Sequence, residues 1–222
     1  MRWTMAAAAF AALALELFAV LTTPHFFGSG GRPWAGLSAV AAILCVYGAA
    51  GWFAIPGARR AGIMSVAAPA GLIAGGVYAA EIILEYVVRP TDNTPWGLAE
   101  FGAVFALMGI AGGLLAWRTR RLRSALAGAM WTGMIGVLIW YLVLLAVFCA
   151  FRGTAAQEAV FRAEGDYEDF ARSGMRDFQV FAMQDFLGAG FFHLVLSPIF
   201  GLILGAIGGG VGLLIPRRDT PT

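Results

Sequence analysis

Six long runs of apolar residues fill most of the 222-residue chain, and short connections that carry most of its charges separate them. A helix needs about 20 residues, at 1.5 Å each, to cross the roughly 30 Å hydrocarbon core of a bilayer. Each run meets this length. We therefore expect an all-α integral membrane protein, one membrane domain over 1–222 with six transmembrane helices at 5–23, 35–55, 63–88, 96–117, 124–151 and 186–215.

The segment 152–185, between the last two runs, has a different pattern. Its apolar residues recur at helical spacing, with charged residues between them: Ala156, Val160, Ala163, Tyr167 and Phe170. This predicts an amphipathic helix outside the bilayer, broken near Ser173 and Gly174.

The polar face of this helix is acidic, because 152–185 holds seven acidic residues against four arginines, whereas helices that bind anionic lipid are basic. Two interpretations stay open. The helix is a solvated cover over the membrane helices, or it is a docking surface for a partner, formed by Glu164, Tyr167, Glu168, Asp169 and Phe170.

Composition argues against a separate water-soluble domain. Hydrophobic residues make up 60% of the chain, the mean hydropathy is +0.78, and only 13% of the residues are charged, against about 25% in soluble domains. The bilayer is therefore the first partner that the sequence predicts.

The arginines predict the orientation. They cluster in alternate connections, at Arg59 and Arg60, at Arg118, Arg120, Arg121 and Arg123, and at Arg217 and Arg218. The positive-inside rule places these connections, together with Arg2, in the cytoplasm. We therefore expect a multi-pass protein of a bacterial inner membrane, with both termini cytoplasmic.

Two connections resemble each other. The first turn reads Pro24 to Pro33-Trp34 after Glu16, and the second reads Pro90 to Pro95-Trp96 after Glu81. This suggests three helical hairpins, the third enlarged by the outside segment. Convergence on common membrane features explains the likeness equally well.

Small residues spaced by four or three form faces on two of the expected helices: Ala67, Gly71, Gly75 and Ala79 on one, and Gly201, Gly205, Gly208 and Gly212 on another. Such faces let helix backbones approach closely. They can join helices within the chain or join separate subunits. Pro69 and Pro198 interrupt the same two helices and should kink them or open a cavity.

Four glutamates lie inside the expected helices, at Glu16, Glu81, Glu85 and Glu100, and His193 lies at a similar depth. A carboxylate in a membrane is costly, so it faces a partner, a cavity or a pathway. All of these residues fall between the midplane and the outer surface. We therefore expect one polar vestibule that opens to the outside.

One helix gives this vestibule its geometry. Glu81, Glu85 and Arg89 are spaced by four residues, so they stack on one face, with the Arg89 guanidinium able to pair with Glu85. Three roles stay open for the deeper Glu81: a packed, protonated carboxyl, a proton or cation site, or an anchor for a larger ligand.

The two histidines, His25 and His193, allow a bis-imidazole haem or a mixed His/Glu metal site. The Glu-x-x-His pairs of di-iron bundles and the CxxCH of attached haem are both missing from the sequence. We favour structural histidines and predict no cofactor.

Hydrolase triads, phosphate-binding glycine loops and basic nucleic-acid patches are also missing from the sequence. An enzyme or a nucleic-acid binder is therefore not expected. The favoured hypothesis is a non-catalytic membrane subunit or scaffold, held to other chains or to copies of itself by the glycine faces and the acidic outer helix. The alternative is a proton-coupled transport module for a small solute or ion, built on the carboxyl-lined vestibule.

Overall fold

The computed structural model describes residues 2–28, 31–88 and 94–216, and within these ranges the chain contains helices and no strand. The helices are α1 (Arg2–Leu21), the short 3-10 helix η1 (Phe26–Gly28), α2 (Gly31–Phe53), α3 (Ile55–Arg60), α4 (Met64–Val87), α5 (Thr94–Thr119), α6 (Leu122–Ala150), α7 (Ala155–Ala163), α8 (Asp166–Ser173) and α9 (Phe178–Leu214). Six of them, α1, α2, α4, α5, α6 and α9, are long and apolar enough to cross a membrane. The chain is an all-α polytopic membrane protein, as predicted.

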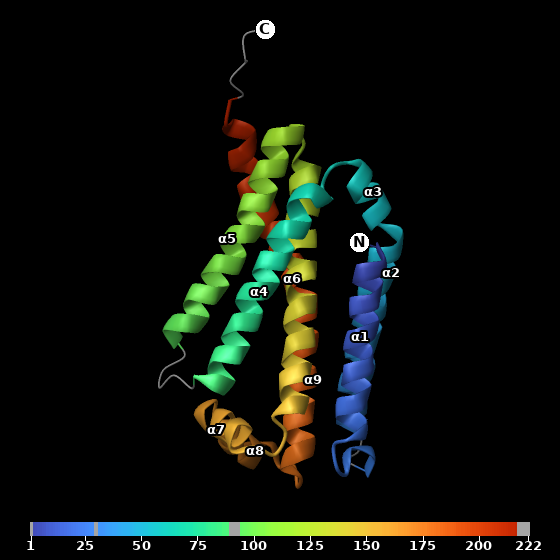
Figure 1. The fold of residues 1–222 in the computed structure, drawn as a ribbon, viewed down its shortest axis with the longest axis vertical. Coiled ribbons are helices and arrows are strands. Elements are labelled where there is room, and N and C mark those ends of the chain that lie inside the picture. The colour runs from blue at the N-terminus through green and yellow to red at the C-terminus, as the bar shows by residue number, and fades with distance from the viewer. Residues whose placement is uncertain (1, 29–30, 89–93, 217–222) are drawn as a thin grey trace.

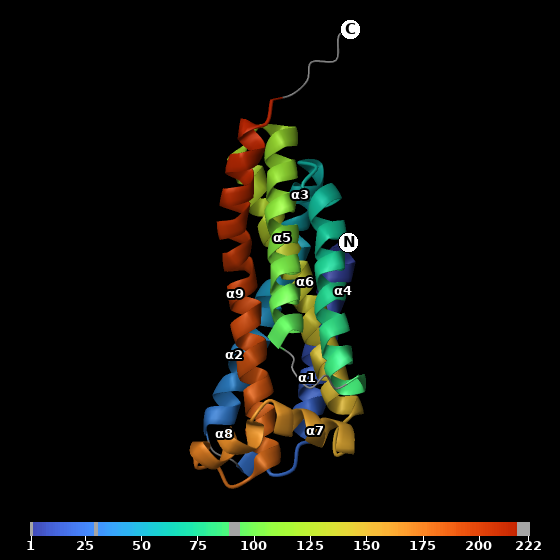
Figure 2. The same ribbon diagram turned by 90° about the vertical axis from the view of Figure 1, so that its left-hand side faces the viewer.

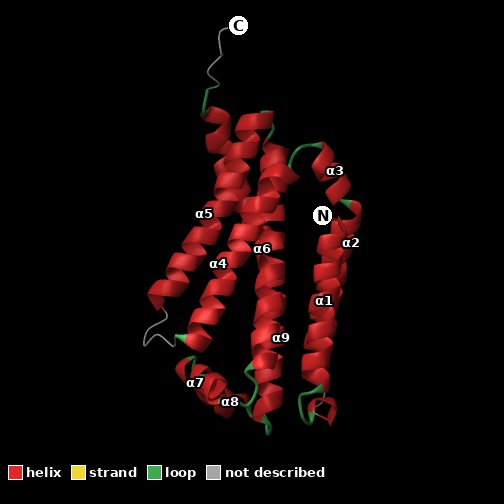
Figure 3. Ribbon diagram, viewed as in Figure 1, coloured by secondary structure: helices red, strands yellow, loops and turns green. Residues whose placement is uncertain are grey.

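Helix α6 is the centre of the bundle and contacts α1, α4, α5 and α9. The pair α1 and α2 lies on one flank of α6, and α4 and α5 lie on the other (Figure 1). In the view turned by 90°, α5 lies between α9 and α4 (Figure 2). The helix α3 lies at one end of the bundle, and α7 and α8 lie at the other (Figure 3).

The sequence of α6 explains its central place. Every residue from Trp131 to Leu138 is buried, so no face of this stretch is left for lipid or water. A helix that is apolar all round is typically buried, because it has no polar face to turn outward.

The small-residue faces pack helices of the same chain against one another. On α4, Gly71 and Gly75 lie against Ile135 and Ile139 of α6. On α9, Gly201 and Gly205 lie against the α6 backbone, and Gly208 and Gly212 lie against the backbone of Gly109 and Gly113 in α5. These faces are therefore occupied within the bundle.

The last membrane helix begins earlier than the expected 186. Helix α9 starts at Phe178, because the Asp177 carboxylate accepts hydrogen bonds from the main-chain N–H groups of Gln179 (2.9 Å) and Val180 (3.1 Å). The predicted outside segment 152–185 is correspondingly shorter, since its last residues form the first turns of α9. Asp185 is tolerated there because it is exposed.

The outside amphipathic helix is two helices. Gly165, at φ +82°, separates α7 from α8, and Gly174, at φ +70°, ends α8. The second break is the one predicted near Ser173 and Gly174. The first was missed, although a glycine at positive φ is the common way to end a helix.

The end of the bundle that carries α3 also holds the arginines of two connections. Arg59 and Arg60 lie in the last turn of α3. Arg118 lies in the last turn of α5, Arg120 and Arg121 connect α5 to α6, and Arg123 lies in the first turn of α6. Arg120 donates hydrogen bonds to the main-chain oxygens of Leu213 (3.0 Å) and Ile215 (2.9 Å), so it satisfies carbonyl groups at the end of α9. Arg217 and Arg218 lie outside the described residues.

Candidate functional site

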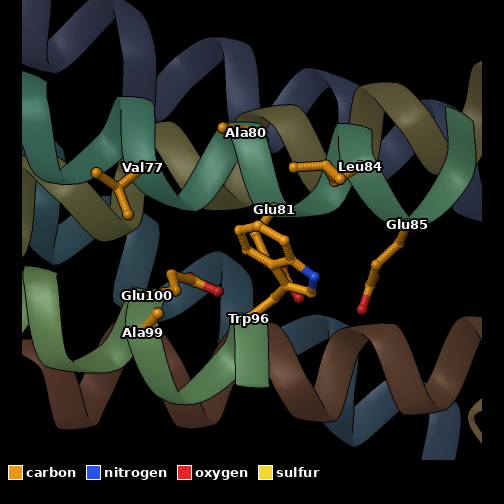
Figure 4. Close-up of a pocket in the computed structure, with 8 residues that line it drawn as sticks. All are labelled: Val77, Ala80, Glu81, Leu84, Glu85, Trp96, Ala99 and Glu100. Atoms are coloured by element: carbon orange, nitrogen blue, oxygen red, sulfur yellow. The ribbon is translucent and has the colours of Figure 1, made fainter. Parts of the chain in front are cut away.

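Glu81, Glu85 and Glu100 line one pocket between α4 and α5, with a volume of about 280 Å³. The other described lining residues are Val77, Ala80, Leu84, Trp96 and Ala99. Figure 4 shows the side chains of Glu81, Trp96 and Glu100 in the space between the two helices. Three of the glutamates assigned to the predicted vestibule thus line one pocket.

Helical spacing explains why these side chains meet. Val77, Glu81 and Glu85 are four residues apart and share one face of α4, and Trp96 and Glu100 share one face of α5. The predicted stack of Glu81 on Glu85 is therefore present. Its third member, Arg89, lies outside the described residues.

The carboxyl groups interact with one another. The Glu81 carboxyl lies within electrostatic reach of the Glu85 and Glu100 carboxyls. Glu100 is buried, with 8% of its surface exposed, and Glu81 and Glu85 are partly buried. Carboxylates this close repel one another in a setting poor in water, so a proton or another cation has to compensate their charge.

The acidic field continues beyond the pocket to the end of the bundle. Helix α7 contacts α4, and the charge of Glu164, which follows α7, reaches Glu81. In α8, partial burial together with the nearby carboxylates of Asp185, Glu164 and Asp169 raises the pKa of Asp166 to about 6. Acidic groups therefore extend from the α7–α8 end into the pocket.

Glu16 does not belong to this pocket, which corrects the single vestibule predicted from the sequence. It lies in α1, on the other flank of α6 (Figure 1), and its exposure is 0%. Both of its carboxyl oxygens lack a hydrogen-bond partner within the described part of the chain. The titratable group that its charge reaches is Tyr141 of α6.

His193 is also separate from the pocket. Its ring packs on Trp140 of α6, with centroids 4.4 Å apart, and its Nδ1 lies 2.9 Å from the main-chain oxygen of Ala189. The ring therefore has the partners of a structural histidine, and it does not line the carboxyl pocket.

His25 lies in the turn after α1, exposed and at φ +58°, where it lines a second cavity of about 770 Å³ beside Arg176 and Asp177. The two histidines thus have different surroundings. Among the described residues, no group of three or more His, Cys, Asp and Glu side chains is placed to hold a metal ion.

The aromatic residues predicted for partner docking, Tyr167 and Phe170, are partly buried and pack on α9 of the same chain. Tyr167 stacks on Phe178, with centroids 4.4 Å apart and planes at 12°, and Phe170 contacts both Phe178 and Phe181. Phe178 and Phe181 belong to the first turn of α9, so these contacts exist because α9 begins earlier than expected. The acidic members of the predicted surface, Glu164, Glu168 and Asp169, are exposed, and Asp169 pairs with Arg172 of the same helix.

Trp96 lines the pocket, although the sequence analysis did not assign it to the site. The signal was present, because Trp96 precedes Glu100 by four residues and so shares its face. Tyr141 was missed altogether, since a tyrosine in an apolar helix has no pattern that links it to Glu16.

Known proteins give no guide to this site, since no family model, curated protein or solved structure matches the chain. Its function has to be inferred from its own residues.

Proposed function

We propose that the chain is a membrane transport module that binds a small organic cation in the pocket between α4 and α5. The observation that carries the proposal is the convergence of Glu81 and Glu100, from two helices, on one apolar-walled pocket. No Arg, Lys or His is among the described residues that line it. A cation is the ligand that such a charge requires.

The walls favour an organic cation over a bare metal ion. Val77, Leu84 and Trp96 offer apolar contact, and an indole face attracts a cationic nitrogen. A divalent metal ion needs six or more oxygen ligands, or a tight set of N and S ligands, and the described residues contain no group placed to supply them. The volume of about 280 Å³ limits the ligand to a small molecule.

Protons are expected to compete for the same carboxyl groups. A protonated Glu81 or Glu100 cannot balance the charge of a bound cation. Cation binding and proton release are therefore linked, which is the basis of proton-coupled exchange.

The arginine distribution supports one orientation. With the end that carries Arg59, Arg60 and the Arg118–Arg123 connection in the cytoplasm, as the positive-inside rule favours for a bacterial inner membrane, the pocket lies in the outer half of the bilayer. The acidic residues of α7 and α8 then face the outside, where their field raises the local concentration of cations.

The alternative, a non-catalytic subunit or scaffold, ranks second. It relied on the glycine faces and on the acidic outer helix. The glycine faces have partners inside the bundle, and so do Tyr167 and Phe170 of the outer segment. Its remaining support is the exposed acidic side of α8, with Glu168 and Asp169.

A binding experiment tests the proposal. The probe is radiolabelled tetraethylammonium, added to the full chain in lipid nanodiscs, and binding is measured by scintillation proximity at pH 5 and pH 8. We expect saturable binding at pH 8, weaker binding at pH 5, and at least about a tenfold loss of affinity in Glu81→Gln/Glu100→Gln, which corresponds to about 1.4 kcal/mol.

Glu168→Gln is the matched control, because it removes an acidic charge from the same end of the bundle outside the pocket, and it should keep most of the affinity. Failure of the wild-type chain to bind the probe saturably, or equal binding by the double variant, would overturn the proposal.

A further inference from the structure

We infer that Glu16 and Tyr141 form a second, separate site in the membrane, one that binds a proton where α1 packs on α6. The inference does not rest on the cation pocket, which lies on the other flank of α6. The two sites share no residue.

Glu16 has the environment of a group that holds a proton. It has 0% exposure, and neither of its oxygens accepts a hydrogen bond within the described residues. An ionised carboxylate in such a place is very unfavourable, and the common remedy is to bind a proton.

Tyr141 is its neighbour across the helix contact. The hydroxyl is buried, has no hydrogen-bond partner in the described part of the chain, and lies within electrostatic reach of Glu16. The ring is held by α9, because a Cβ added at Gly190 would lie 2.3 Å from Tyr141 Cε2. The position of the hydroxyl is therefore fixed by packing.

Among the described residues, no ion pair reaches Glu16. Arg152, which follows α6, donates through Nη2 to the main-chain oxygen of Ala19 (3.0 Å) and through Nη1 to Thr22 Oγ1. In α2, the described side chains that titrate are Cys45, which is exposed, and Tyr47, whose hydroxyl bonds Leu194 of α9.

A proton fits this site better than any larger ligand. Glu16 lines none of the three cavities described among residues 2–28, 31–88 and 94–216, and a metal ion would need further oxygen or nitrogen ligands that the described residues do not place there. When a proton binds, one carboxylate oxygen becomes O–H and the charge disappears. The neutral carboxyl and the phenol then each have one donor and free acceptors, so they are complementary.

Infrared difference spectroscopy tests the inference directly. The full chain in lipid nanodiscs is titrated from acidic to alkaline pH, in the background of Glu81→Gln/Glu100→Gln so that the pocket contributes little. We expect a C=O band of a protonated carboxylic acid near neutral pH that shifts in D₂O and disappears at alkaline pH.

Glu16→Gln should abolish this band, and Tyr141→Phe should move its frequency, because it removes the polar hydroxyl that lies within electrostatic reach of the Glu16 carboxyl. Glu168→Gln should change neither. Where Glu16→Gln fails to fold, Glu16→Asp supplies the test, since it keeps a carboxyl at the same place and should shift the band.

Three results would overturn the inference: a band that survives in Glu16→Gln, no band near neutral pH in the Glu81→Gln/Glu100→Gln background that keeps Glu16, or loss of the band on adding Na⁺ at constant pH. The last result would mean that the site holds a metal cation. Each outcome is independent of tetraethylammonium binding, so failure here leaves the proposed function untouched.

Discussion

The hydroxyl of Tyr47 in α2 donates a hydrogen bond of 2.7 Å to the main-chain oxygen of Leu194 in α9. Pro198, four residues further along α9, has no N–H with which to bond that oxygen. Tyr47 therefore supplies the donor that the proline lacks. In a membrane no water is at hand to replace it, so this bond both fixes α2 on α9 and makes Pro198 tolerable.

Tyr47→Phe should lower the free energy of unfolding by about 1–3 kcal/mol, because it leaves the buried Leu194 carbonyl without a donor. Unfolding in mixed micelles measures the loss. The matched test is Pro198→Ala, which restores an N–H to α9. Tyr47→Phe should cost much less in that background, and an equal cost in both backgrounds would contradict the account.

Gly208→Ala should destabilise the bundle by about 1–3 kcal/mol or more, since the new Cβ would lie 2.0 Å from the main-chain oxygen of Gly109 and two backbones would have to separate. Gly210→Ala is the matched control, two residues along the same helix, where an added Cβ has no atom within 4 Å. Thermal unfolding in detergent should rank Gly208→Ala well below Gly210→Ala. Equal melting temperatures would refute the close contact of α5 and α9.

The sequence predicted those parts of the structure that local spacing determines. The six spans follow from apolar length, and Glu81 falls beside Glu85 because a helix repeats every 3.6 residues. Local spacing gives no information on contacts between helices that are far apart in the sequence. Glu16 and Glu81 were therefore placed together at similar depths, although α6 separates them.

The predicted helix boundaries were wrong where two local signals competed. Asp177 is a good helix cap, but Gln184 and Asp185 made the following turns look like part of the outside segment. The break at Gly165 was missed because the apolar residues on its two sides keep helical spacing across it.

Arg152→Lys should weaken the attachment of the end of α1 to α6. The Arg152 guanidinium donates hydrogen bonds to both Ala19 and Thr22, and it lies 4.8 Å from the Phe148 ring centroid. A lysine ammonium does not reproduce this geometry. Because the side chain is partly exposed, we expect a loss of about 1 kcal/mol in unfolding free energy.

Arg176→Lys makes the same chemical change at an exposed arginine, and it should leave the stability unchanged. Hydrogen exchange should also rise at the end of α1 in Arg152→Lys alone. If both variants behave alike, the Arg152 contacts contribute nothing measurable.

Asp166, in α8 outside the six spans, should make stability depend on pH. Partial burial, and then the carboxylates of Asp185, Glu164 and Asp169, raise its pKa from 3.8 to about 6. The folded chain thus binds this proton more tightly than the unfolded chain does. The resulting stabilisation is fully present below pH 3.8 and is lost as the pH rises through about 6.

Asp166→Asn is neutral at every pH, so it should unfold at a higher temperature than the wild type at pH 7.5 and show a smaller difference between pH 4.5 and pH 7.5. The expected gain at pH 7.5 is about 1 kcal/mol, because water screens a half-exposed carboxylate and reduces the full effect of the pKa shift. Glu168→Gln, at an exposed position of the same helix, should keep the wild-type dependence. If Asp166→Asn keeps the full wild-type difference in unfolding temperature between pH 4.5 and pH 7.5, then Asp166 is not the source of the pH dependence.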